Sequence, residues 1–134
     1  MFLWLSAKFK ATYPDMHARY MKALGRSGIM NSPFAPWSTV SLNMDFACQP
    51  HLDKKDYSNG LCWVVTFGDE DEGFTGGELE LIDLNVKVAM QDGHIVAFRS
   101  HCIEHQVLPY TGKRNSLVLF FCDNLYYSTK RVRQ

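Results

Sequence analysis

The amino-acid sequence predicts a mainly β protein, a sandwich or barrel with one helix in front of it. Short runs rich in Val, Leu, Phe and Thr follow one another from residue 39 onward. Their spacing is close to the ~8–12 residues that such folds show. Before residue 38, one segment instead repeats its apolar residues with the helical period. The 134 residues suffice for a single domain with a core of its own.

The helix is expected over residues 13–28. Pro14 suits the first turn of a helix, and Asp15 suits the positive end of the helix dipole. Gly25 or Gly28 would end the helix. Its apolar stripe recurs every four residues, at Met16, Tyr20 and Leu24. Residues 31–37 contain two prolines and are expected to form a loop.

Seven strands are expected after this loop. The stretch GGELELIDL alternates acidic and apolar residues, so Leu79 and Leu81 should face a core. Residues 91–93 and 110–113 contain glycine and are expected to be turns. The expected strands are Thr39–Phe46, Leu61–Phe67, Glu78–Ile82, Val86–Met90, His94–Arg99, Ile103–Leu108 and Asn115–Phe121.

The composition narrows the function classes. Lys+Arg and Asp+Glu both number 14, so the net charge is zero, whereas duplex-binding proteins usually carry a basic surplus. The longest apolar start, MFLWL, is far too short to span a bilayer and lacks the features of a signal peptide. The four cysteines form no CxxC pair and so show no zinc-site spacing. Without a secretory signal they are expected to be reduced thiols in an intracellular protein, cytoplasmic or nuclear, with paired disulfides as the less common alternative and with no membrane partner.

One pair of residues suggests chemistry. His51 and Asp53 are two residues apart in QPHLDKKDY, and in an extended segment 48–53 both side chains would point to one face. His105 follows about fifty residues later. Two imidazoles and one carboxylate form the facial triad of non-haem Fe(II) oxygenases, which leaves coordination positions open. We therefore take His51, Asp53 and His105 as candidate metal ligands and catalytic residues.

Arg114 and Ser116 complete this pattern. Arg114 follows His105 by nine residues, across a glycine turn, and a hairpin would place them on adjacent antiparallel strands. Ser116 would face the same way as Arg114. A planar guanidinium binds a carboxylate bidentately, so Arg114 with Ser116 could clamp the distal carboxylate of 2-oxoglutarate. Each residue alone has a commoner structural explanation, as His17, His94 and His101 illustrate, and only the combination favours a site.

Three stretches carry a resemblance to a known family: PHLDKKDY, FTGGELEL and DGHIVAFRSHCIEHQVLPYTGKRNSLVLFF. Together they resemble the Fe(II)/2-oxoglutarate dioxygenases of the double-stranded β-helix fold, a jelly-roll or cupin-like architecture. Within these the chain is most similar to the TET/JBP superfamily, especially its short fungal members. The resemblance implies that His51, Asp53 and His105 bind iron. It also implies that Arg114, Ser116 and Asn43 bind 2-oxoglutarate.

The resemblance further implies one dioxygenase domain over residues 1–134, with residues 1–37 as helical support and 38–125 as the β-helix core. It implies Fe(II) as the metal cofactor, 2-oxoglutarate and O2 as co-substrates, and the hydroxylation of a C–H bond. The methyl group of a modified pyrimidine in nucleic acid is one candidate substrate. The alternative substrates are a small molecule and a protein side chain. The alternative to an enzyme is a non-catalytic cupin-like binding module.

Candidate contacts to a nucleic acid are two groups of side chains. Trp37, Tyr57 and Phe74 could offer a stacking face, although the commoner interpretation is that they belong to the core or its rim. The cations that could meet phosphate are Lys54, Lys55, Arg99, Arg131 and Arg133.

Overall fold

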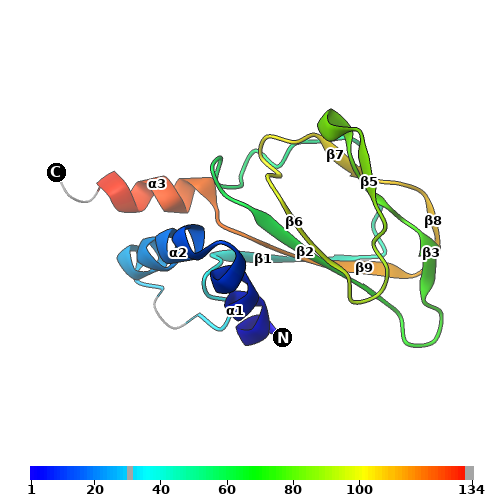
Figure 1. Ribbon diagram of the computed structural model, residues 1–134, viewed down its shortest axis with the longest axis horizontal. Coiled ribbons are helices and arrows are strands. Elements are labelled where there is room, and N and C mark those ends of the chain that lie inside the picture. Colours follow the sequence, from blue (N-terminus) through cyan, green and yellow to red (C-terminus); the bar gives the residue numbers. More distant parts are fainter. Residues whose placement is uncertain (30–31, 132–134) are drawn as a thin grey trace.

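The computed structural model describes residues 1–29 and 32–131 and contains a strand-rich part with helices packed at one end (Figure 1). The helices are α1 (Phe2–Thr12), α2 (Pro14–Ser27) and α3 (Asp123–Arg131), and a 3₁₀ turn, η1, spans Ile82–Leu84. The strands are β1 (Thr39–Met44), β2 (Cys62–Gly68), β3 (Phe74–Gly76), β4 (Leu79–Leu81), β5 (Val86–Val88), β6 (Ile95–Phe98), β7 (His105–Val107), β8 (Tyr110–Gly112) and β9 (Arg114–Phe120).

The strands form antiparallel sheets. The larger sheet has the order β1-β9-β2-β6, the smaller has the order β5-β4-β7, and β3 pairs with β8 as a two-stranded ribbon. Neighbours in the larger sheet are mostly distant in sequence, because β9 returns from the end of the chain to lie between β1 and β2. The chain therefore winds between two sheets that enclose a shared interior.

Strand β9 shows how the larger sheet separates two environments. Leu117 and Leu119 belong to the core under the helices, whereas Ser116 and Val118 line an interior cavity on the other face. Successive side chains of a strand point to opposite faces, so this alternation follows from the sequence RNSLVLF. One face of the sheet is thus fixed by packing while the other is free to carry polar groups.

An aromatic core joins the helices to the larger sheet. Phe9 of α1 is fully buried and its ring lies 5.7 Å from that of Trp37, 5.4 Å from Tyr20 and 5.1 Å from Trp63 of β2. Large aromatic side chains bury most area per residue, so this cluster supplies much of the apolar burial that holds the helices on the sheet. A second, smaller core of Cys62, Leu79, Leu81, Met90 and Phe98 packs between the sheets.

The expected strands are all present, most of them shorter, but the structure adds elements. The sequence predicted one N-terminal helix, whereas the structure has two. Helix α1 was not predicted because it has apolar residues around most of its surface and so lacks an amphipathic stripe. Helix α3 was also missed. Strands β3 and β8 are not predicted, because each has three residues and no periodicity. The expected turn at residues 110–113 is wrong, since Tyr110–Gly112 form β8.

The expected hairpin of His105 with Arg114 is wrong. β7, which begins with His105, pairs with β4, whereas β9, which begins with Arg114, pairs with β1 and β2. β8 lies between them in sequence and pairs with β3. The two residues therefore belong to different sheets and not to adjacent strands.

Within residues 1–29 and 32–131, no helix is both long enough and apolar enough to cross a membrane. All four cysteines carry free thiols, as the sequence predicted, and Cys62 is the one that is fully buried.

We predict that Phe9→Ala destabilises the protein by about 3–5 kcal/mol, because a buried phenylalanine leaves a cavity in a packed core. Leu3→Ala in the same helix is the matched control, since Leu3 is 86% exposed and should change the free energy of unfolding little. Urea denaturation of both variants measures the difference. Equal losses in the two variants would contradict the role of Phe9 in core packing, since alanine itself favours a helix.

Candidate metal centre

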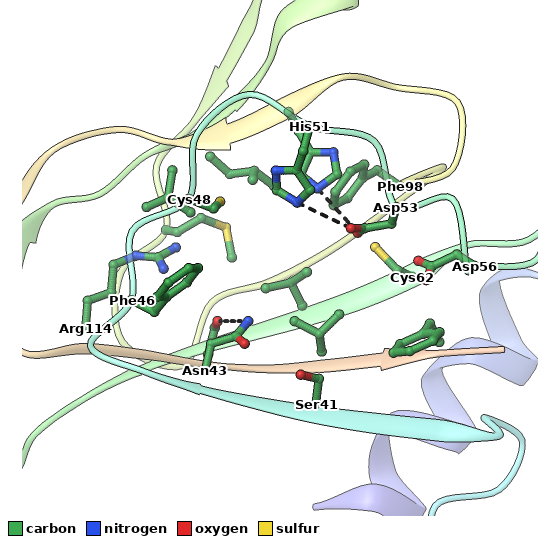
Figure 2. A pocket seen from close by; sticks show the side chains of 18 residues that line it. Ser41, Asn43, Phe46, Cys48, His51, Asp53, Asp56, Cys62, Phe98 and Arg114 are labelled. Atoms are coloured by element: carbon green, nitrogen blue, oxygen red, sulfur yellow. Dashed lines mark hydrogen bonds and ion pairs between the residues drawn. The ribbon is translucent and has the colours of Figure 1, made fainter. Parts of the chain in front are cut away.

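His51, Asp53 and His105 come together at one point of the interior. The Asp53 carboxylate lies between the two rings, with Oδ1 3.3 Å from Nε2 of His51 and Oδ2 3.4 Å from Nε2 of His105. One ligand atom from each of the three residues lies within 4.8 Å of the others. Figure 2 shows the contacts that join Asp53 to the imidazoles. The three side chains are arranged as one site.

Two backbone hydrogen bonds hold the two histidines side by side. The N–H of His51 donates to the carbonyl of His105 at 3.0 Å, and the N–H of His105 donates to the carbonyl of His51 at 3.1 Å. This is an isolated antiparallel bridge, so the expected extended segment 48–53 is not a regular strand. Nevertheless His51 and Asp53 do point to one side, as the two-residue spacing predicted.

Both histidines present the same nitrogen to the site. Nδ1–H of His51 donates to the carbonyl of Gln49 at 2.8 Å, and Nδ1–H of His105 donates to the carbonyl of Ile103 at 2.8 Å. Each acceptor lies two residues before its histidine. A proton fixed on Nδ1 leaves the Nε2 lone pair free in the neutral ring, which is the form that binds a metal. The donor set therefore fits a divalent cation such as Fe(II).

The three groups differ in exposure. The side chains of His51 and Asp53 are 39% and 32% exposed, whereas that of His105 is 6% exposed. Burial lowers the pKa of His105, but the hydrogen bond and charge of Asp53 and the Ile103 carbonyl outweigh it, so its pKa is raised overall. The site is thus anchored on the buried His105 and opens to solvent beside His51 and Asp53.

The triad forms part of a cavity of about 250 Å³. This volume lies slightly below the ~300–1,000 Å³ of pockets for drug-sized ligands, so it suits a small molecule with a few polar ends. Figure 2 shows the side chains that converge on it from the sheets and the loop before His51. They are Ser41, Asn43, Phe46, Cys48, His51, Asp53, Asp56, Cys62, Val64, Leu79, Met90, Phe98, His105, Val107, Arg114, Ser116, Val118 and Phe120.

Arg114 is the cation of this cavity. It is 3% exposed, its guanidinium lies 5.8 Å from the ring centroid of Phe74, and its Nε has no hydrogen-bond partner among the described residues. Burial lowers its pKa, yet an arginine keeps its charge in proteins. A buried charge with an unpaired donor is costly unless an anion meets it. The site therefore fits a carboxylate ligand.

Gly77 makes room for Arg114. A Cβ at this position would lie 2.6 Å from Cδ and 2.8 Å from Nε of Arg114. The backbone of Gly77 also has φ +72°, a conformation that other residues rarely adopt. The second glycine of FTGGELEL is thus explained by the space that the arginine occupies.

Ser116 and Asn43 lie beside each other across the β1–β9 pairing. Their Cα atoms are partners in the register, and Nδ2 of Asn43 is 3.5 Å from Oγ of Ser116, a long hydrogen bond. Both side chains line the cavity, as does Arg114, so the predicted common orientation of Arg114 and Ser116 holds. All six predicted site residues therefore line this one cavity.

A family model for the oxygenase domain of the 2OGFeDO superfamily, named Tet_JBP, matches residues 1–123. The superfamily name abbreviates 2-oxoglutarate and Fe(II)-dependent dioxygenases. The chain belongs to the Tet_JBP family. Because the match spans residues 1–123, the assignment covers α1, α2 and the sheets.

This Tet_JBP domain is similar to one known protein in sequence and to another in structure. It is 27% identical over 106 residues to thymine dioxygenase JBP1-A of Trypanosoma cruzi (strain CL Brener). The aligned region covers 79% of this chain and 12% of that protein. It is also similar to NgTET1, solved in complex with 5mC DNA, with a TM-score of 0.74 and 21% identity over 93% of this chain and 48% of that one. The chain thus spans less than half the length of either relative.

The structural similarity confirms the expected mainly β, double-stranded β-helix fold with helical support at its N-terminus. By family the chain is a 2-oxoglutarate-dependent dioxygenase domain, and this membership argues against a non-catalytic cupin-like module. The superfamily implies Fe(II) and 2-oxoglutarate. His51, Asp53 and His105 could hold the metal, and the unpaired Arg114 fits a dicarboxylate.

Several residues of the Tet_JBP cavity were not singled out from the sequence. Asp56 is 6% exposed, and burial raises its pKa to about 6 although the hydrogen bond from Ser100 opposes this. Cys48 and Phe46 come from the loop before His51, and Cys62 comes from β2. The second aspartate of DKKD, three residues after Asp53, could have indicated Asp56, whereas the other residues carry no local signal.

The predicted stacking face is wrong for two of its three members. Trp37 is fully buried under the helices and Tyr57 is 6% exposed, so neither can stack on a base. Phe74 is half-buried and lies under Arg114. These aromatic side chains are core and rim residues, which is the commoner interpretation that the sequence favoured.

The candidate phosphate-binding cations differ in their surroundings. Lys54 and Lys55 are exposed and follow directly after Asp53. Arg99 is exposed but donates to the carbonyl of Ser58 at 3.1 Å. Arg133 lies outside the described residues, as does the side chain of Arg131.

The three remaining histidines are part of ordinary hydrogen bonds, as expected. His17 lies 3.1 Å from the Ser6 hydroxyl, His94 lies 3.1 Å from the Ala89 carbonyl, and His101 donates to the Asp56 carbonyl at 2.8 Å.

We predict that Gly77→Ala weakens 2-oxoglutarate binding by about 10- to 100-fold, the loss expected when a charge-assisted bidentate contact is displaced. The new Cβ would push the Arg114 side chain from its place. Gly93→Ala is the matched control, because Gly93 has φ +76° with nothing within 4 Å of an added Cβ. Titration of both variants with 2-oxoglutarate measures the effect. An equal loss in both would assign it to backbone strain.

Proposed function

We propose that this domain is an Fe(II)- and 2-oxoglutarate-dependent dioxygenase that hydroxylates the C5 methyl group of a pyrimidine base in nucleic acid. The observation that carries the proposal is the placement of His51, Asp53 and His105 in one cavity with the buried Arg114. A structural metal site has no use for an unpaired guanidinium beside it. A dioxygenase needs both, because its metal and its dicarboxylate must meet.

The metal would be held by Nε2 of His51, Nε2 of His105 and one oxygen of Asp53. When bound, Fe(II) supplies the activation of O2, coupled to the decarboxylation of 2-oxoglutarate to succinate. The protein orients these ligands through the Gln49 and Ile103 carbonyls, which keep both rings in one tautomer. Asp53 is the one anion of the triad, so it provides most of the electrostatic attraction for the cation.

The 2-oxoglutarate would enter the polar end of the cavity. Arg114 would bind the distal carboxylate with its planar fork, and Ser116 and Asn43 offer further hydrogen bonds. The apolar walls, which include Val64 and Val118, exclude water from the reacting centre. With 2-oxoglutarate bound, the cavity would have room for only a small part of the primary substrate.

The substrate class is supported by the relatives and by the open side of the triad. One relative is named a thymine dioxygenase, and the other was solved with 5mC DNA. In this chain, His51 and Asp53 face solvent, and the exposed Lys54 and Lys55 follow them. A methylated base that is unpaired or turned out of a duplex could present its methyl group there. Such a substrate agrees with the intracellular location that the sequence predicts.

We predict that Asp53→Ala reduces Fe(II) affinity at least about 100-fold, because it removes the anionic ligand from the site. Calorimetric titration under anaerobic conditions measures the dissociation constant. Asp71→Ala is the control, since Asp71 is an exposed carboxylate in the loop between β2 and β3, outside the cavity. If Asp53→Ala binds iron as tightly as the wild type, the triad is not the metal site.

The substrate proposal is tested with oligonucleotides that contain 5-methylcytosine or thymine, single-stranded and duplex. After incubation with Fe(II), 2-oxoglutarate and ascorbate, mass spectrometry should find hydroxymethyl or further oxidised bases, mostly on single strands. The zero net charge predicts weak duplex binding with a shallow salt dependence. Arg114→Ala should form no product. Succinate formation with a protein or metabolite and no oxidised base would keep the dioxygenase and overturn the nucleic-acid substrate.

A further inference from the structure

The metal ligands come from two segments that are distant in sequence, and a small set of hydrogen bonds joins these segments near the site, among them the one from His101 to the Asp56 carbonyl. His51 and Asp53 lie in residues 51–56, and His105 ends residues 100–105. Beyond the bridge between the two histidines, the N–H of Asp53 donates to the carbonyl of Ser100 at 3.0 Å. This hydrogen bond attaches the backbone of the anionic ligand to the opposite segment.

The side chain of Ser100 makes a second attachment. Its hydroxyl donates to Oδ2 of Asp56. Ser100 is 1% exposed and Asp56 is 6% exposed, so this hydrogen bond is shielded from water. The N–H of Asp56 in turn donates to the carbonyl of Asp53 at 3.0 Å, which closes residues 53–56 into a turn. Ser100 therefore contacts both ends of this turn, Asp53 through its carbonyl and Asp56 through its hydroxyl.

The Asp53 side chain has little else to fix it. It is 32% exposed, and its side-chain contacts among the described residues are with the two histidines that would bind the same metal. The direction of its carboxylate is consequently set by the backbone of the turn. Without the Ser100 hydroxyl, Asp56 would be a buried carboxylate lacking that donor, and the turn would have to open for water to replace it.

We infer that Ser100 is a positioning residue of the metal centre, which holds the Asp53 carboxylate toward the two imidazoles by gripping the 53–56 turn at both ends. The inference rests on the proposed metal site, because it concerns how one of its ligands is oriented. Ser100 itself does not reach the metal. It acts on the site through Asp53, and the loss of such outer hydrogen bonds commonly costs about 10- to 100-fold in metal affinity.

The test uses Co(II) as a spectroscopic substitute for Fe(II), added to the metal-free full chain. Ser100→Ala should bind Co(II) about 10- to 100-fold more weakly and change the visible absorption of the bound ion. Ser6→Ala is the matched control, because Ser6 is a half-buried serine of α1 whose hydroxyl lies 3.1 Å from Nε2 of His17, away from the turn. It should keep the affinity and spectrum of the wild type even if its melting temperature falls.

A double variant separates positioning from a general loss of stability. In an Asp53→Ala background, adding Ser100→Ala should cause no further loss of Co(II) affinity, because the ligand through which Ser100 acts is gone. A further loss as large as in the wild-type background would overturn the inference. So would a Ser100→Ala protein with the wild-type affinity and spectrum.

If Ser100→Ala does not fold, Ser100→Cys keeps a similar shape with a weaker donor, and a smaller loss in the same direction is expected. Wild-type affinity and spectrum in Ser100→Cys would then overturn the inference. Failure of the wild type itself to bind Co(II) would instead contradict the proposed metal site, so the two failures are distinguishable.

Discussion

The antiparallel bridge between the backbones of His51 and His105 is the constraint on which the site depends. It joins a loop after β1 to the first residue of β7, and so connects the two halves of the triad. Because the hydrogen bonds are made by the backbone, they fix where both side chains begin, independently of any metal. The Gln49 and Ile103 carbonyls then fix the ring tautomers. Metal binding would need little further ordering of these two ligands, which favours affinity.

The burial of Arg114, in contrast, costs the ligand-free protein stability and so favours the binding of an anionic ligand. Packing holds the guanidinium under the sheet, between Phe74 and the backbone of Gly77. A charge placed there without an anion destabilises the folded protein, so the residue is hard to explain by stability alone. An incoming carboxylate would relieve this cost. The same arginine thus lowers the stability of the ligand-free protein and gives the cavity its preference for an acid.

The larger sheet serves two purposes because its faces are different. On one face, aromatic residues of α1, β2 and the loop before β1 form a tightly packed layer with Phe9 at its centre. On the other face, the same strands present Asn43, Ser116 and Arg114 to the cavity. The packed face keeps the strands in register, and the register places the polar residues. A site built on such strands is more rigid than one built on loops alone.

Much of this protein could be read from its sequence. Short runs rich in Val, Leu, Phe and Thr located seven strands. The types and spacing of His51, Asp53, His105, Arg114 and Ser116 indicated one site, because chemistry of this kind needs those groups. Tertiary structure decided the rest. The partner of β7 is β4 and not β9. This pairing could not be predicted, because a three-residue strand carries no local information about its partner. Helix α1 has no amphipathic stripe, so only its packing explains it. The grip of Ser100 on the 53–56 turn joins residues more than forty positions apart, and no sequence pattern marks such a contact.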